Sequence, residues 1–293
     1  MCSSPVPRWS ISFGDLRRYP GASVAPDACH VDISDLRRSK HKAQEMPSSF
    51  PLIGLATEYQ RLMTSLRKRQ PLLILGPGGS GKSALIAAVL VDLPRPNGVI
   101  SIQHASNLHH LLVDLARSLI KIDHGPFRKL AKPGSDPERW LSRQTSVHLK
   151  GILWTAFEAE PHPIVLDGVA SAGFPMYRFL QRLYFAKGMA LLAAARDPIA
   201  LGALTRIFWD PRNTVHLRPL NDADANHLFD LAVSHFNIGN LEIEEFRGKV
   251  LDAAKGNPGQ LIEMCRLASN PMYVTGTHIK FAPLRIDVLM KFL

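Results

Sequence analysis

The 293-residue sequence has few cysteines and no long apolar run. Cys2, Cys29 and Cys265 are far apart, odd in number and form no C-x-x-C pair. Neither a disulfide framework nor a cysteine zinc site is therefore indicated, and reduced thiols are expected. No apolar segment of signal-peptide length opens the sequence, and none approaches the length of a membrane span. We therefore expect a cytoplasmic protein.

The sequence also has fewer acidic than basic residues. The 25 Asp and Glu are outnumbered by 35 Lys and Arg, which gives a formal net charge of +10. A surplus of positive charge suits a polyanionic partner such as nucleic acid, although no base-reading module is recognised. A nucleotide as the only polyanion is the alternative.

Residues 1–48 lack periodicity and carry the basic cluster Arg37-Arg38-Ser39-Lys40-His41-Lys42. This composition predicts a flexible, solvated leader. A DNA-contacting arm is the alternative.

A glycine-rich turn follows an apolar run near residue 75. Gly76 to Ser83 match the phosphate-binding pattern G-x-x-x-x-G-K-[ST] without a mismatch. Leu72–Leu75 suit a buried parallel strand, and Ser83–Val91 suit a helix. Because the glycines have no Cβ, the backbone can curl with positive φ and approach a ligand closely. Its amides then form an anion nest with the start of the helix.

This loop predicts a binding site for ATP or ADP with Mg²⁺. Lys82 is expected to reach the β- and γ-phosphates, and the Ser83 hydroxyl to hold Mg²⁺. The predicted nucleotide-binding residues of the loop are Gly76, Pro77, Gly78, Gly79, Ser80, Gly81, Lys82, Ser83 and Ala84.

A second apolar run supplies a carboxylate. Ile164–Leu166 predict a buried strand that ends at Asp167. In open parallel sheets ligands lie at the carboxyl ends of the strands, and a P-loop needs a carboxylate there for Mg²⁺. Asp167 is therefore the predicted second metal ligand, beside Ser83. An Asp that only starts a turn with Gly168 is the alternative.

Strand and helix patterns alternate and then give way to helices alone. The expected fold is α/β, with a P-loop NTPase core of three α/β/α layers and a parallel sheet at 49–219 and a small helical lid at 220–293. Residues 122–139, rich in Gly, Pro, Lys and Asp, predict a loop or insertion. Further strands are predicted at 99–102, 189–195 and 214–218, and further helices at 140–159, 174–187, 198–207, 222–236, 242–254, 258–268 and 281–293.

With these motifs, the chain resembles the AAA+ and STAND group of P-loop ATPases from about Leu52 to Arg266. Pro51–Leu55 is similar to the group's hydrophobic-Gly-Arg-Glu motif, with Leu55-Ala56 in place of Arg-Glu; the resemblance implies adenine contact by Ile53. Gly256-Asn257-Pro258 resembles the Gly-x-Pro motif of the lid, which implies that Pro258 packs on the adenine face. Asn257 is suited to cap that helix and Pro258 to its first turn.

Three further features of this resemblance concern catalysis. Leu191–Asp197 resembles the sensor strand, which implies that Arg196 faces the γ-phosphate. Many members have a Glu directly after the metal-binding Asp, as the base that polarises water, but this chain has Gly168. Hydrolysis is therefore expected to be slow, or another group, such as Asp197 or a group of a partner subunit, positions the water. Arg206 or Arg212 would be the arginine that reaches a neighbour's nucleotide.

Together these features predict an ATP-binding, ATP-hydrolysing switch or assembly ATPase. Its catalytic residues would be Lys82, Asp167 and Arg196, its cofactors ATP and Mg²⁺, and its partners a protein and, in a nucleotide-dependent oligomer, further copies of itself. One alternative is a DNA-associated helper ATPase of the origin-recognition or transposition type. The other is a nucleotide-dependent interaction protein with little hydrolysis.

Some histidines, aromatic residues and a cysteine could be taken for functional residues, but we expect structural roles for them. His104, His109 and His110 lie close in sequence, yet the adjacent pair faces different sides of a helix, which argues against a metal site. Trp140, Trp154 and Phe157 are expected to pack in the core, and Cys265 to be a small buried hydrophobe.

Overall fold

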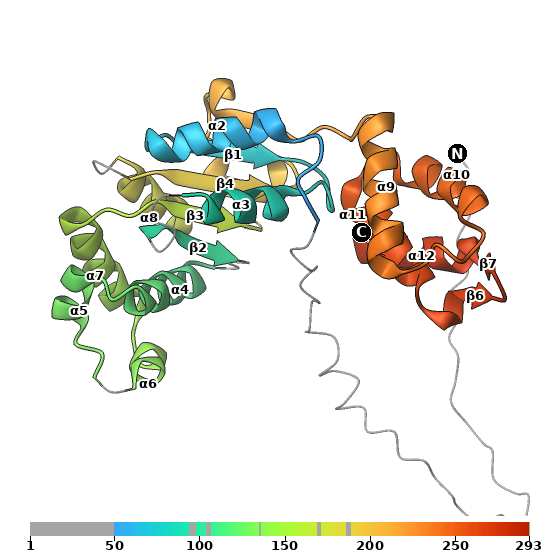
Figure 1. Ribbon diagram of the computed structural model, residues 1–293. Helices are drawn as coiled ribbons and strands as arrows, with labels where there is room; N and C mark the ends of the chain where they lie inside the picture. Colours follow the sequence, from blue (N-terminus) through green and yellow to red (C-terminus); the bar gives the residue numbers. More distant parts are fainter. Residues whose placement is uncertain are drawn as a thin grey trace, which may run out of the picture. The chain divides into compact units, whose positions relative to one another are not determined.

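A five-stranded parallel sheet forms the first part of the molecule (Figure 1). The computed structural model describes residues 50–93, 98–103, 107–134, 136–168, 171–185 and 189–292. The predicted leader at 1–48 and His104 lie outside these residues. The strand order is β2-β3-β4-β1-β5. The strands are β1 (Leu72–Leu75), β2 (Ile100–Gln103), β3 (Ile164–Asp167), β4 (Leu191–Ala195) and β5 (Thr214–His216).

Helices connect these strands and cover both faces of the sheet. They are α2 (Ala56–Arg67), α3 (Lys82–Val91), α4 (Leu108–Lys121), α5 (Gly125–Ala131), α6 (Pro137–Ser142), α7 (Ser146–Ala159), α8 (Phe174–Tyr184) and the 3₁₀ helices η3 (Ile199–Arg206) and η4 (Pro211–Asn213).

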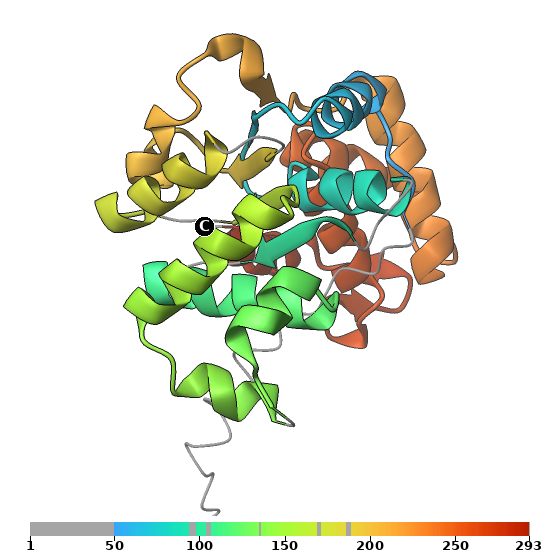
Figure 2. The ribbon, with the colours of Figure 1, turned by 90° about the vertical axis from the view of Figure 1, so that its left-hand side faces the viewer.

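Alternate side chains of each strand enter two different cores. Leu73 and Leu75 of β1 pack in a cluster with residues of α4, α5, α7 and α8, whereas Leu72 and Ile74 pack in a second cluster with residues of α2 and α3. This period of two is that of a β-strand buried on both faces. Figures 1 and 2 show α2 and α3, in blue to teal, on the side of the sheet away from the green helices α4, α5 and α7. The predicted α/β/α core is confirmed.

The segment 122–139 is not the loop that its composition predicts, because it contains α5 and the start of α6. Pro126 and Pro137 lie in the first turns of these two helices, where a missing amide hydrogen costs nothing. The following helix begins at Ser146 instead of residue 140, capped by Thr145. Trp140 and Trp154 pack partly buried at the margin of the core, whereas Phe157 is fully buried as predicted.

The C-terminal region is helical, as predicted, with one addition. It comprises α9 (Asp222–Phe236), α10 (Ile243–Ala254), α11 (Pro258–Ala268), η5 (Pro271–Tyr273), the hairpin of β6 (Val274–Thr275) and β7 (His278–Ile279), and α12 (Phe281–Phe292). These elements share their own hydrophobic cluster. Cys265 is fully buried in it, and burial raises the pKa of its thiol to about 12. It is therefore a buried hydrophobe, as predicted.

A buried carboxylate joins the last helix to α11. Glu263 accepts hydrogen bonds from Arg266 on its own helix, at 2.7 and 2.8 Å. Its Oε1 also lies 2.9 Å from the ammonium of Lys291 near the end of α12. Burial opposes the charge of Glu263, but the bonds to Arg266 and Lys291 outweigh it and lower its pKa. This pairing fixes the position of the end of α12.

The Glu263→Gln substitution is expected to destabilise the protein near neutral pH, by about 1–3 kcal/mol for the loss of charged hydrogen bonds. Because the folded pKa is lowered, this stabilisation is present above the ordinary Glu pKa of about 4.3 and is lost as the pH falls through the folded value. Chemical unfolding of both proteins between pH 3 and 8 measures it. A difference that stays constant across this range would contradict the ion-pair account.

Candidate functional site

The phosphate-loop sequence connects β1 to α3 at the carboxyl edge of the sheet. Gly79 has φ 78° and Gly81 has φ 93°, and Gly81 is the N-terminal cap of α3. Both values lie in the left-handed region that glycine adopts without strain. Lys82 and Ser83 are the first two residues of α3, and Ser83 is exposed.

Lys82 is bonded to the inside of its own loop. Its Nζ donates to the carbonyl oxygens of Gly76 and Pro77, at 2.7 and 2.8 Å, and lies 3.4 Å from Ser80 Oγ. Burial of the ammonium lowers the pKa of Lys82, the nearby carboxylate of Asp167 partly restores it, and Arg196 lowers it further. A partly desolvated cation with two exchangeable carbonyl partners is a suitable donor for an incoming anion.

The other two predicted catalytic residues come from the neighbouring strands. β4 lies between β3 and β1, and its Ala194 and Ala195 pair with Asp167 and Leu75. Asp167 ends β3 and Arg196 directly follows β4. The parallel sheet therefore brings Asp167 and Arg196 to the same edge as Lys82, within the range at which both affect its pKa.

The residue after Asp167 carries no side chain and has φ 75°. Asp197, the substitute named above for the missing Glu, accepts the amide of Ala200 at the start of η3 through its Oδ1, at 2.8 Å.

The start of α11 lies directly on the phosphate loop. Asn257 donates through Nδ2 to the carbonyl of Gly78 at 2.8 Å, and the amide of Gly259 donates to the carbonyl of Gly79 at 2.8 Å. A Cβ on Gly259 would stand 2.6 Å from the Cα of Gly79, so the close approach requires glycine on both sides. Asn257 also caps α11 through Gln260, as predicted.

Pro258, one of the two residues predicted to contact adenine, lies near the phosphate loop. Pro258 Cγ is 4.0 Å from the position that a Cβ on Gly81 would take, and Leu55 is 3.4 Å from it. Ile53 packs, partly buried, with the cluster of α9–α12. Gly81 thus lies between the N-terminal motif and the lid motif.

The end of α12 also reaches the loop. The carbonyl oxygen of Phe292 accepts from Nη2 of Arg196 at 3.3 Å. The ring of Phe292 would be 2.8 Å from a Cβ on Gly79. Sequence reasoning missed this contact, as it missed Gly259, because the partners are more than 90 residues apart and no local pattern marks them.

The fold has relatives among solved structures, although no protein-family model and no curated protein matches the sequence. The Cdc6p structure of Pyrobaculum aerophilum aligns with a TM-score of 0.58 at 14% identity, over 85% of this chain and 70% of that one. The Aeropyrum pernix ORC1 protein, solved in complex with DNA, aligns with a TM-score of 0.55 at 12% identity, over 83% and 66%. The ADP form of the Aeropyrum pernix ORC2 protein aligns with a TM-score of 0.53 at 12% identity, over 87% and 72%.

This chain has the fold of the AAA+ P-loop ATPases.

The two arginines predicted as candidates to reach a neighbour's nucleotide both have partners within the chain. Arg206 lies over the rings of Phe174 and Tyr177, at 4.8 and 5.9 Å from their centroids. Arg212 pairs with Asp210 at 2.9 Å. Arg206 is exposed.

The Gly259→Ala substitution tests the contact between α11 and the phosphate loop of this AAA+ fold. The added Cβ cannot fit 2.6 Å from Gly79, so α11 must move away. Hydrogen exchange is expected to speed up in residues 76–83 and 257–261, as measured by mass spectrometry on peptides.

Gly248→Ala is the matched control, because Gly248 is in the interior of α10 and a Cβ there meets no atom within 4 Å. It is expected to leave exchange in the loop unchanged and to raise the unfolding free energy by about 0.5–1 kcal/mol. Unchanged loop exchange in Gly259→Ala would show that the contact does not order the loop.

Proposed function

We propose that this chain binds ATP with Mg²⁺ at the phosphate loop and hydrolyses it slowly, as a nucleotide-controlled switch or assembly ATPase. The observation that carries the proposal is the placement of Lys82, with its ammonium on the carbonyls of a glycine loop and with Asp167 and Arg196 at the same sheet edge. Two cationic groups and one carboxylate around a bare backbone loop suit a phosphate chain and its metal ion.

The proposed roles follow from this chemistry. Lys82 would exchange the carbonyls of Gly76 and Pro77 for phosphate oxygens, and the loop amides would donate to the same oxygens. Ser83 and Asp167 would ligate Mg²⁺, which screens the charge of the phosphates. Arg196 would exchange the carbonyl of Phe292 for the γ-phosphate as a fixed bidentate donor.

The change of partner at Arg196 would connect nucleotide state to α12. In the present structure Arg196 bonds to the end of α12, and Asn257 bonds to the loop carbonyl of Gly78. A γ-phosphate that competes for Arg196 would weaken the hold on α12. We propose the division into a core at 49–219 and a lid at 220–293 on this basis, with a protein partner or further copies of the chain responding to the lid.

A location in the cytoplasm completes the proposal. None of the helices in the described part of the chain has the length and hydropathy to cross a bilayer. The odd and scattered cysteines are compatible with a reducing compartment.

The Lys82→Ala substitution tests the proposal. ATP turnover in the presence of Mg²⁺, measured by phosphate release, is expected to fall about 100-fold or more, as for the loss of one charge-stabilising donor. Lys68→Ala, an exposed lysine at the end of α2, is the control and should keep the wild-type rate. Equal turnover in Lys82→Ala and wild type would overturn the assignment of the site.

The Phe292→Ala substitution tests the competition at the loop. Removing the ring that lies against Gly79 is expected to tighten ATP binding, about tenfold if the contact contributes about 1.4 kcal/mol. Met290→Ala, two residues earlier and 69% exposed, is the control. Fluorescent-nucleotide titration measures both. Weaker binding in Phe292→Ala would mean that the ring supports the nucleotide site instead of competing with it.

A DNA-associated helper ATPase is a second candidate, favoured by a basic and aromatic surface on α8. Arg182 stacks on Trp154 with 3.7 Å to the ring centroid, and Arg178 and Arg206 lie over Phe174. Stacked arginines and aromatic rings are common in sites for single-stranded nucleic acid. DNA affinity that falls linearly with the logarithm of salt concentration would favour this candidate.

A third candidate is an interaction protein that binds nucleotide without hydrolysing it. Gly168 in place of a glutamate favours it, as does the hydrogen bond of Asp197 to the amide of Ala200. Tight ATP binding with turnover no higher than that of Lys82→Ala would select this candidate.

A further inference from the structure

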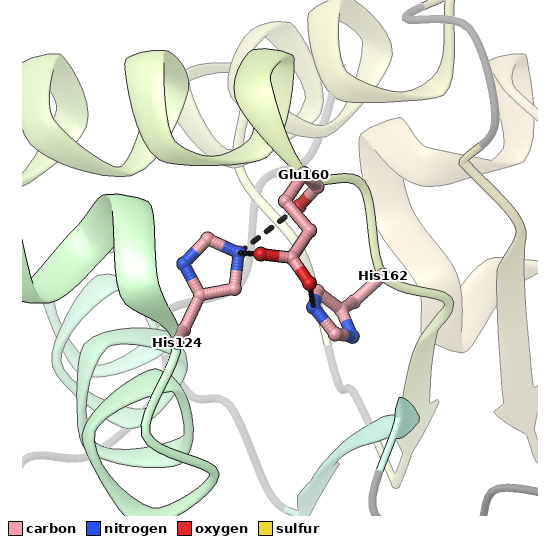
Figure 3. A group of neighbouring side chains, drawn as sticks. All are labelled: His124, Glu160 and His162. Carbon is pink, nitrogen blue, oxygen red and sulfur yellow. Dashed lines mark hydrogen bonds and ion pairs between the residues drawn. The ribbon is translucent and has the colours of Figure 1, made fainter.

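Three potential metal ligands converge at the opposite edge of the sheet from the phosphate loop. His124 precedes α5, Glu160 follows α7, and His162 lies two residues before β3. Figure 3 shows the carboxylate of Glu160 between the two imidazoles. The nearest ligand atoms of all three side chains lie within 4.8 Å of one another.

The tautomer of His162 is fixed by its surroundings. Its Nδ1 lies 2.8 Å from the carbonyl oxygen of Gly98, which can only accept, so Nδ1 carries the proton. In the neutral ring, Nε2 then has a lone pair. This atom is buried and has no hydrogen-bond partner, and it faces Glu160 Oε1 at 3.7 Å. A cation between a buried lone pair and a carboxylate oxygen would satisfy both acceptors.

His124 completes the set from the other side. Its Nε2 lies 3.8 Å from Glu160 Oε2 and 3.1 Å from the carbonyl oxygen of Glu160. Its Nδ1 accepts the amide of Phe127 at 3.1 Å, so Nε2 carries the proton of the neutral ring in this structure. Metal ligation by Nε2 therefore requires the proton to shift to Nδ1, which gives up the cap of α5.

We propose that His162 Nε2, Glu160 and His124 Nε2 bind a divalent transition-metal ion of the zinc class. Ligands of a tetrahedral zinc ion with bonds of about 2.0–2.1 Å are about 3.4 Å apart. Each imidazole lies 3.7 or 3.8 Å from one oxygen of Glu160, and one ligand atom from each of the three residues lies within 4.8 Å of the others, so the group would have to contract around an ion. Two imidazoles favour zinc over magnesium. The carbonyl of Gly98 on His162 Nδ1–H is the outer-shell partner typical of metal-bound histidines.

The exposure of the Glu160 side chain bears on which group could fill the fourth coordination position of such an ion. Its side chain is 55% exposed, whereas the side chains of His124 and His162 are 0% and 15% exposed. Glu160 therefore offers the most open approach for water to a fourth coordination position. The ion would join the start of α5 to the end of α7, a structural clamp that is independent of nucleotide binding.

A second group in the described residues serves as a control. Glu242, Glu245 and His278 also lie close together, but all three are exposed. Glu245 is paired with Lys249 at 2.5 Å, and His278 lies 3.1 Å from Glu242 Oε2. These side chains already have partners and are solvated, so they make a poor site.

Equilibrium dialysis of the full chain against Zn²⁺, without an affinity tag, tests the proposal. We expect one tight ion per chain, which raises the midpoint of thermal unfolding. His162→Asn keeps a side-chain donor for Gly98 and removes Nε2, and Glu160→Gln keeps the shape and removes the charge. Each should weaken binding by more than the roughly 10–100-fold cost of losing an outer-shell partner.

Three further variants make the result specific. His124→Asn can still cap α5 through its oxygen and should weaken binding, whereas His278→Asn should not. Asp167→Asn removes the proposed magnesium ligand and should keep the tight zinc site. Absence of a tight site in wild type would overturn the proposal. Unchanged binding in His162→Asn, or its loss only in Asp167→Asn, would overturn it too.

Discussion

The backbone at Gly79 has to stay free of a side chain, because groups from two C-terminal helices approach the phosphate loop there at contact distance. Lys82 bonds to its carbonyls from within the turn, Gly259 places the start of α11 against Gly79, and Phe292 lies against the same residue. Any Cβ at Gly79 would meet Asn257 at 2.6 Å and Phe292 at 2.8 Å. The loop therefore joins the sheet to the C-terminal helices as well as providing donors for an anion.

Under the proposed function, this joint would connect nucleotide binding to a change of conformation. The ammonium of Lys82 and the guanidinium of Arg196 are bonded to carbonyl oxygens of Gly76, Pro77 and Phe292. Phosphate oxygens are stronger acceptors for the same donors. Exchange at Arg196 would take a partner from α12, whose end is also bonded to α11 through Glu263 and Lys291. A ligand can shift an equilibrium between two conformations only by its difference in affinity for them. An Arg196 side chain that bonds to a phosphate in one conformation and to Phe292 in the other would provide such a difference.

Much of this site could be predicted because its signals are local. β1, the glycine turn and α3 are contiguous in sequence. Asp167 ends a strand that is predicted to be buried from its three apolar residues, Ile164–Leu166. Where composition was ambiguous, prediction failed: Pro126 and Pro137 suggest a loop at 122–139 but lie in the first turns of α5 and α6. The contacts of Gly259, Phe292 and the group around Glu160 depend on tertiary packing, which no local pattern encodes.

The most direct measurement is a calorimetric titration of the folded chain with ATP, and with ADP, in the presence of Mg²⁺. The account predicts one binding event per chain for the wild type and its loss in Lys82→Ala. Absence of heat with either nucleotide, across several temperatures, on protein whose fold has been verified would contradict it.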